Sequence, residues 1–238
     1  RDDYATLKYN SNGVQQWVQR YNGPGNFFDN ATSMVVDSLG NVYVTGRSDG
    51  IESSDYATIK YNNNGLQQWI QRYSGLDNSG GNGGSIAVDV LGNVYVTGSS
   101  IGIGTLWDYA TIKYNSNGVQ QWVQRYNGPD NTSANTGLIA VDVLGNVIVT
   151  GSSNGIGTNI DYATIKYNSN GNEQWVQRYN GPGISGDYVQ SMVVDNFGDV
   201  YITGYSYGIE NNADYATIKY NSNGVQQWVQ RYNGPDNN

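Results

Sequence analysis

The sequence predicts an all-β fold made of repeated four-stranded antiparallel sheets. Three observations carry this prediction: a repeat with a period of about 53 residues, two kinds of hairpin pattern within each period, and the lack of any stretch with a helical period. Residues 108–131 and 214–237 are identical, and similar copies begin at Asp3, Asp55 and Asp161. Because a fixed period of this size marks a repeat architecture, we expect one array rather than unrelated domains.

The segment that begins at each of these aspartates predicts a β-hairpin. Tyr109–Tyr114 is rich in β-branched and aromatic residues, and residues 115–118 supply a turn because Asn and Gly tolerate positive φ. A second extended run follows over Val119–Tyr126. If Tyr114 faces Val119 across a four-residue loop, Asp108 faces Arg125. The same strand register in the other copies pairs Asp3 with Arg20, Asp55 with Arg72, Asp161 with Arg178 and Asp214 with Arg231.

A second, more apolar module lies between these hairpins. In its first copy, Ser33–Asp37 and Val42–Gly46 flank a turn in which Asp37 is expected to accept hydrogen bonds from backbone amides. Its strands are apolar on both faces, a pattern typical of strands that are buried on both faces. We therefore expect each repeat to combine a buried hairpin with a more solvated one. The other copies are 85–98, 138–151 and 191–204.

Four strands in each repeat, repeated in series, predict the blades of a β-propeller. The apolar hairpin is expected on the inside of each blade and the Tyr/Trp hairpin that follows it on the outside. The chain, 1–238, is then a single array with a lone outer hairpin, 1–23, and four blades, 32–75, 85–128, 138–181 and 191–234. One tryptophan recurs at the same position of every outer hairpin and is expected to fill the gap between blades: Trp17, Trp69, Trp122, Trp175 and Trp228.

The composition argues against several function classes. The net charge of −8 disfavours binding to a phosphate backbone, and no apolar run approaches the roughly 20 residues of a membrane-spanning helix, so we expect neither a nucleic-acid partner nor membrane insertion. Cysteine and histidine are both absent, which removes thiolate chemistry and the commonest general base and metal ligand. No spacing singles out a pair of carboxylates. The expectation is therefore that the protein is not an enzyme and has no cofactor and no metal site.

Three motifs resemble the bacterial β-propeller repeat of the SBBP type. They are Asp-Tyr-Ala-Thr-Ile-Lys-Tyr, Trp-Val-Gln-Arg-Tyr-Asn-Gly and Val-Asp-x-x-Gly-Asn-Val-Tyr-Val-Thr-Gly, and the likeness covers nearly the whole chain. The resemblance implies secreted or surface-located bacterial proteins with tandem blades, and hence an extracellular or cell-surface location. It implies no settled activity and carries no catalytic motif onto these positions.

The differences between repeats concentrate in the long connections, which should all lie at one end of the blades. Because function commonly lies on loops that a rigid scaffold presents, any ligand or partner should bind at this end. The alternative, which the pattern favours, is that these loops vary because nothing constrains them. Trp107 is either a stacking platform for a sugar or a partner residue, or it packs against Ile101 and Ile103. The candidate residues at this end are Arg47, Glu52, Trp107, Asp187, Tyr205, Tyr207 and Glu210.

The pattern holds five outer hairpins and four inner ones, so the strands do not balance. The chain is then a section of a longer array, a four-bladed unit with a spare hairpin, or a subunit whose open blade edges join neighbours. An unpaired edge invites association, and a head-to-tail contact that does not close gives a filament. The sequence thus favours a non-enzymatic structural or adhesive scaffold that forms a homo-oligomer or filament or binds proteins. The alternative is a propeller that binds a carbohydrate or peptide at the long-connection end.

Overall fold

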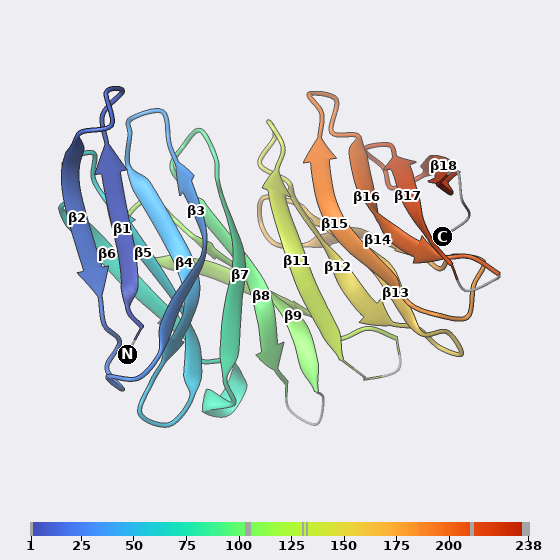
Figure 1. Cartoon of the computed structure of the whole chain (residues 1–238), viewed down its shortest axis with the longest axis horizontal. Helices are drawn as coiled ribbons and strands as arrows, with labels where there is room; N and C mark the ends of the chain where they lie inside the picture. The colour runs from blue at the N-terminus through green and yellow to red at the C-terminus, as the bar shows by residue number, and fades with distance from the viewer. Residues whose placement is uncertain (1, 103–105, 130, 132, 210–211, 235–238) are drawn as a thin grey trace. The chain divides into compact units, whose positions relative to one another are not determined.

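The chain folds into antiparallel β-sheets joined in sequence order (Figure 1). The computed structural model describes residues 2–102, 106–129, 131, 133–209 and 212–234. Strands β1 and β2 form a two-stranded sheet, and the remaining strands form four sheets of four strands each. The predicted all-β architecture of four-stranded blades with one additional hairpin is confirmed. In the part of the chain that the structure describes, no helix is long and apolar enough to cross a membrane.

Each sheet is a meander in which consecutive strands pair. The additional hairpin is β1 (Tyr4–Tyr9) and β2 (Gln15–Tyr21), and the first full sheet is β3 (Asp29–Val36), β4 (Val42–Asp49), β5 (Ser54–Tyr61) and β6 (Gln67–Tyr73). A short 3₁₀ turn, Leu76–Asn78, precedes β7 (Gly81–Val88), β8 (Val94–Ile101), β9 (Trp107–Tyr114) and β10 (Gln120–Tyr126). The last two sheets are β11 (Ala134–Val141), β12 (Val147–Asn154), β13 (Ile160–Tyr167), β14 (Glu173–Tyr179) and β15 (Asp187–Val194), β16 (Val200–Tyr207), β17 (Ala213–Tyr220), β18 (Gln226–Tyr232).

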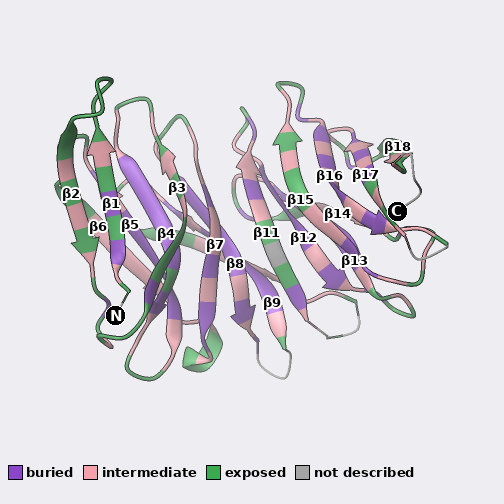
Figure 2. Ribbon diagram, viewed as in Figure 1, coloured by how far each residue is buried: buried purple, intermediate pink, exposed green. Residues whose placement is uncertain are grey.

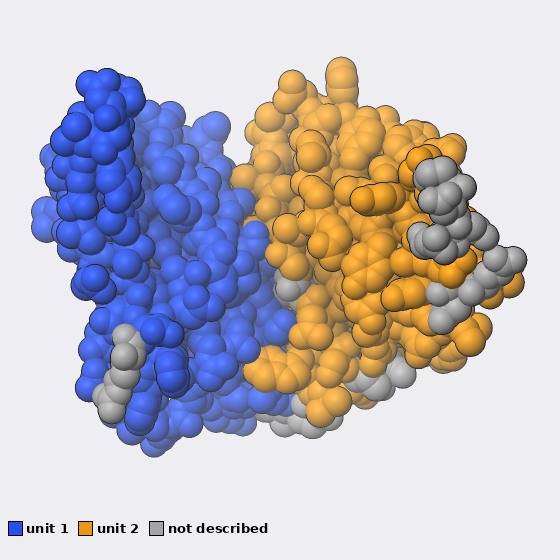
Figure 3. All heavy atoms as spheres, in the orientation of Figure 1, with its two compact units in different colours: residues 1–104, 110–123 blue, residues 105–109, 124–238 orange. Residues whose placement is uncertain are grey.

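Contacts divide the chain into two compact units, which Figure 3 colours separately. Unit 1 comprises Arg1–Gly104 and Ala110–Val123, and unit 2 comprises Thr105–Tyr109 and Gln124–Asn238. Within each unit, adjacent sheets pack face to face through apolar side chains. In every sheet the short turns lie at one end, here called the short-turn end, and the longer loops lie at the other, the long-connection end.

The core lies over the two middle strands of a sheet, which Figure 2 shows as the most buried. On one face, Tyr4 packs with Val44 and Ile59; on the other face, Tyr43 and Tyr56 pack with the next sheet. The expectation that the first, apolar hairpin of each repeat is the buried one is therefore wrong. The buried pair is β4 and β5, one strand from each hairpin, because the clusters cover both faces of these strands, whereas Met34 of β3 is 55% exposed.

The turn between the first two strands of a sheet is built on an aspartate, as the sequence predicts. Asp37 Oδ1 accepts hydrogen bonds from the amides of Leu39 and Asn41, both at 2.9 Å. Its Oδ2 accepts from the Asn41 side chain at 2.8 Å and from the Tyr43 hydroxyl at 3.0 Å. Burial opposes ionisation of this carboxyl, but the bonds from Asn41 and its other neighbours outweigh it and lower the pKa of Asp37.

The outer hairpins are paired two residues away from the predicted register. Arg178 faces Ala163 rather than Asp161. The difference arises because Asn168 pairs with Asn172 around a turn in which Gly171 has φ of 85°, and because the strands shift again between Lys166 and Tyr167.

A slip of two residues keeps each side chain on the same face of the sheet. The predicted ion pair therefore still forms across a diagonal, with 2.9 Å between Arg178 Nη2 and Asp161 Oδ2. The Asp55–Arg72, Asp108–Arg125 and Asp214–Arg231 pairs form in the same way.

We expect the Asp161→Ala variant to lower the free energy of unfolding by about 2–4 kcal/mol, because it leaves the half-buried Arg178 guanidinium without its carboxylate. Urea denaturation followed by tryptophan fluorescence measures the change. The matched control is Asp49→Ala, which breaks an ion pair whose Arg47 side chain is 49% exposed and should cost less than about 1 kcal/mol. Equal losses in the two variants would contradict a structural role for the Asp161–Arg178 pair.

Candidate functional site: the seam between sheets and its two open faces

Within each compact unit, the tryptophan of an outer hairpin packs on the outer-hairpin turn of the next sheet. The indole of Trp69 lies so close to Gly118 that a Cβ built on this glycine would come within 2.8 Å of the indole ring. Gly118 also has φ of 80°, so only glycine fits this position without strain. Trp69 Nε1 donates to the Ser116 carbonyl at 3.1 Å, and the ring centroids of Trp69 and Tyr114 are 6.1 Å apart.

The same contact recurs at two further seams. Trp17 packs on Gly65 and donates to the Asn63 carbonyl at 3.1 Å. In unit 2, Trp175 packs on Gly224 and donates to the Ser222 carbonyl at 3.2 Å. Trp17, Trp69 and Trp175 thus lie between adjacent sheets, where the sequence pattern places them.

Basic side chains add polar contacts to these seams. Lys60 Nζ donates to the Ser116 carbonyl at 3.1 Å, the same oxygen that Trp69 reaches, and Lys166 Nζ donates to the Ser222 carbonyl at 3.2 Å. At the long-connection end, Arg231 Nη1 donates to the Tyr179 hydroxyl of the preceding sheet at 3.0 Å. Each seam therefore combines an apolar centre with hydrogen bonds at both ends.

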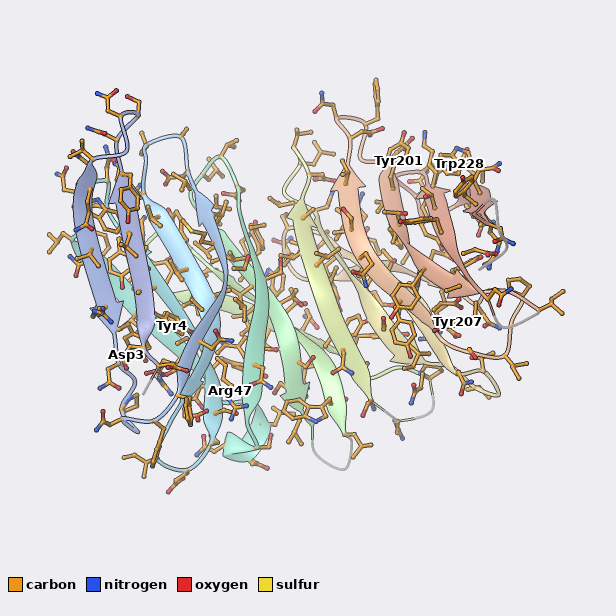
Figure 4. The ribbon with its side chains drawn as sticks, viewed as in Figure 1. Asp3, Tyr4, Arg47, Tyr201, Tyr207 and Trp228 are labelled. Atoms are coloured by element: carbon orange, nitrogen blue, oxygen red, sulfur yellow. The ribbon has the colours of Figure 1, made fainter. Side chains whose placement is uncertain are left out.

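The last sheet has the tryptophan side of a seam, but in the described residues no glycine turn packs on its tryptophan. Tyr215 is 68% exposed, whereas the equivalent Tyr56, Tyr109 and Tyr162 are at most 1% exposed. Trp228 is 37% exposed and lies beside Tyr201 of its own sheet, with 6.2 Å between ring centroids (Figure 4). We call the surface formed by Tyr215, Trp228 and Tyr232 the tail face.

The first hairpin carries the complementary half. Tyr9 is 54% exposed, whereas its equivalents in the four full sheets are at most 3% exposed. Leu7 is 41% exposed where the other sheets bury an isoleucine, and a Cβ on Gly13 would meet no atom within 4 Å. We call the surface formed by Leu7, Tyr9 and Gly13 the head face. It is the side of the seam that receives a tryptophan.

The candidate residues at the long-connection end belong to different sheets and to both compact units. Arg47 of β4 is exposed and forms an ion pair with Asp49 at 2.8 Å, and Glu52 is exposed in the loop between β4 and β5. Trp107 is half-buried at the start of β9. Ile103, one of its expected neighbours, and Glu210 lie outside the described residues.

In unit 2, the candidate residues fall into two environments. Asp187 is fully buried at the start of β15, where its Oδ2 accepts a hydrogen bond of 2.6 Å from the Gly181 amide. Burial raises the pKa of Asp187, although the bonds from Gly181 and Ser206 oppose the shift. Tyr205 and Tyr207 lie side by side with 6.2 Å between ring centroids, and Tyr188 stacks on Tyr205.

The sequence singles out Trp228, but none of the other members of the two open faces. Tyr215 and Tyr232 have the same neighbours in sequence as Tyr109 and Tyr126, so no local signal distinguishes them. Tyr188 was also missed, but it had a signal, because the three other inner hairpins have asparagine at this position.

The described residues contain no cluster of three or more Asp, Glu, His or Cys side chains that is suited to hold a metal ion. The carboxylates at 55, 108, 161 and 214 are each paired with an arginine.

Comparison with known proteins supports the repeat assignment. Residues 16–51, 68–104 and 174–210 match the family model described as "Beta-propeller repeat", SBBP. No curated protein matches the chain.

Among solved structures, a "putative gluconolactonase" is similar with a TM-score of 0.50 and 11% identity, over 97% of this chain and 71% of that one. A eukaryotic initiation factor is similar with a TM-score of 0.39 and 9% identity, over 96% and 65% of the two chains. Regucalcin, a calcium-binding protein from Agrobacterium tumefaciens, gives a TM-score of 0.29 and 10% identity over 86% and 75%.

The similarity to the first of these structures corrects one expectation. The absence of histidine, cysteine and a distinct carboxylate pair predicts that the protein is not an enzyme, but a protein described as a "putative gluconolactonase" has a similar fold. Enzymatic activity is therefore not excluded. At 11% identity the likeness concerns the fold alone and assigns no reaction to this chain.

We expect Trp69→Ala to lower the free energy of unfolding by about 3–5 kcal/mol, because it empties a closed seam. Trp228→Ala, in the same hairpin position but on the tail face, should cost about 1–2 kcal/mol, since this indole already meets solvent. Both variants are compared by urea denaturation in dilute protein. Equal losses of the free energy of unfolding in the two variants would show that Trp69 gains no stabilisation from packing on the next sheet.

Proposed function

We propose, from the premise that this chain is an array of SBBP-type β-propeller repeats, that it serves as a scaffold whose copies associate head to tail. The observation that carries the proposal is the difference in exposure between equivalent residues. Tyr215 and Tyr9 are more than half exposed in the terminal hairpins, whereas their counterparts inside the array are buried. An extracellular or cell-surface location, where such a scaffold would act, is part of the proposal.

The two open faces are complementary in shape. The tail face presents an indole, and the head face presents the uncovered turn with Gly13, which stands where Gly65, Gly118 and Gly224 receive an indole. Joining a tail to a head would therefore repeat a contact that the chain already makes at its internal seams.

The faces also match in hydrogen-bonding groups. At internal seams the indole N–H donates to the carbonyl of the second residue of the turn, and Ser11 holds this position in the first hairpin. Arg231 bonds to Tyr179 of the preceding sheet, so a second copy's Arg20 is placed to reach Tyr232 in the same way. Each new seam thus satisfies donors and acceptors as well as burying aromatic surface.

Such a contact is heterologous, since the tail of one copy meets the head of the next. Each added copy leaves a new head and a new tail exposed, so association continues unless the series closes. Exposed aromatic residues grouped on one face favour association for the same reason.

We expect sedimentation velocity of the 26.0 kDa chain to show oligomers whose mass rises with protein concentration. Trp228→Ala disables the tail and Tyr9→Ala disables the head, so each variant alone should remain monomeric. An equimolar mixture of the two should form dimers and nothing larger, because one intact tail then meets one intact head.

The matched control is Phe197→Ala, which removes an exposed aromatic side chain from a short turn outside both faces and should leave oligomerisation unchanged. Monomers of wild-type protein at every concentration would overturn the proposal. So would oligomers that persist in both single variants.

A further inference from the structure

We propose that unit 2 holds a binding site for a neutral carbohydrate at the long-connection end of its last two sheets. The site is lined by Tyr188 and Tyr207, with Tyr205 packed against both rings, beside the asparagines of the preceding sheet. It is separate from the head and tail faces and does not depend on self-association.

The three tyrosines form one cluster where β15 begins and β16 ends. Tyr188 and Tyr205 are directly opposite each other in the antiparallel pair, and their rings stack with 4.9 Å between centroids and 24° between planes. Tyr207 meets Tyr205 edge to face, at 6.2 Å and 78°. Figure 4 shows Tyr207 at the opposite end of the sheet from Tyr201 and Trp228.

The cluster is a concerted departure from the repeat. The positions equivalent to Tyr188 hold asparagine in every other full sheet, at 30, 82 and 135. The positions equivalent to Tyr205 hold Arg47, Ser99 and Ser152, and those equivalent to Tyr207 hold Asp49, Ile101 and Asn154. Three aromatic residues therefore occur together in one sheet, at positions that touch one another.

The core does not require these rings. The sheet β11–β14 has the same strand pairing with Asn135, Ser152 and Asn154 in their place. All three tyrosines are only half-buried. Aromatic rings held partly in solvent, next to a cavity, are better explained by contact with a ligand than by packing.

Two adjoining hollows open beside the cluster, with volumes of about 370 and 450 Å³. They share Asn154, Ile160 and Tyr188, and the larger one is also lined by Asn159 and Tyr207. The side-chain amide of Asn159 donates a hydrogen bond to the Ile184 carbonyl, and this bond fixes the orientation of the Asn159 side chain beside the larger hollow. Volumes in this range suit ligands the size of one or two sugar rings.

The chemistry of the lining selects a neutral polar ligand. Among the described residues that line the two hollows there is no Asp, Glu, Lys or Arg. A tyrosine is uncharged at neutral pH, and burial together with the neighbouring phenols of Tyr188 and Tyr207 raises the pKa of Tyr205 further. Asparagine amides and tyrosine hydroxyls offer donors and acceptors without charge.

A carbohydrate presents the complementary surface. One face of a pyranose ring carries C–H groups that pack on an aromatic ring, while the hydroxyls at its edge bond to amide and hydroxyl groups. An anionic ligand would lack a cation here, and an apolar ligand would make no use of the amide and hydroxyl groups of the lining. The lining therefore favours a neutral sugar.

The test is isothermal titration of the full chain with methyl glycosides of glucose, galactose, mannose and N-acetylglucosamine, and with cellobiose and lactose. We expect saturable binding of at least one of these sugars at millimolar or lower concentration, and no binding of glucuronic acid. The triple variant Tyr188→Asn, Tyr205→Ser, Tyr207→Asn should weaken the affinity by at least about tenfold, which is about 1.4 kcal/mol.

The triple variant gives the sheet β15–β18 the residues that the sheet β11–β14 already has at the same positions. Circular dichroism and thermal unfolding should therefore show a folded protein. Arg47→Ser is the matched control, since it makes the equivalent change in another sheet and should leave sugar binding intact. Trp228→Ala should also bind sugar normally, which keeps this result independent of self-association. The proposal is overturned if none of the neutral sugars binds, if only a peptide or the acidic sugar binds, or if the triple variant binds as wild type.

Discussion

The stacking of an indole on a glycine turn is the contact on which the rest of the structure depends. Each sheet alone has two apolar faces and buries neither. The contact of Trp69 with Gly118 closes the outer part of the seam between the first two full sheets. In the same seam, Tyr43 and Tyr56 of the first full sheet pack against the second. The glycine is required twice, by its positive φ and by the absence of a Cβ. A fold of this kind has stability that resides largely between neighbouring repeats.

Because the contact is directional, an open series of sheets ends in two different surfaces. The final tryptophan faces away from the array, and the first turn has no indole on it. The exposure of Trp228 and of Gly13 follows from this geometry and requires no change in sequence. Identical repeats make the two surfaces fit each other, which links the regularity of the sequence to a tendency to associate.

Much of the fold is predictable from the sequence, because the period and the hairpin motifs are local. The blade count, the aspartate turns and the diagonal Asp161–Arg178 ion pair all follow from residues close in the chain. The strand register was not predictable by counting, since the pairing of Asn168 with Asn172 around the turn and the irregularity between Lys166 and Tyr167 each shift it. The sequence predicts open blade edges but not the residues that they expose: Tyr109 and Tyr215 lie in identical segments, yet one is 1% and the other 68% exposed. Residues that depart from the repeat, in contrast, can be recognised in the sequence, and Tyr188 could have been found by comparing the copies position by position.

Exchange of the indole N–H protons with solvent, followed by NMR on protein labelled with ¹⁵N at tryptophan, tests the central contact most directly. The structure predicts slow exchange for Trp17, Trp69 and Trp175, whose Nε1 groups are bonded to turn carbonyls. Trp228 should exchange rapidly in dilute protein and slow as the concentration rises and its face is covered. If Trp228 exchanges as slowly as Trp69 at every dilution, or if all four exchange rapidly, the indole–glycine seam does not organise this protein.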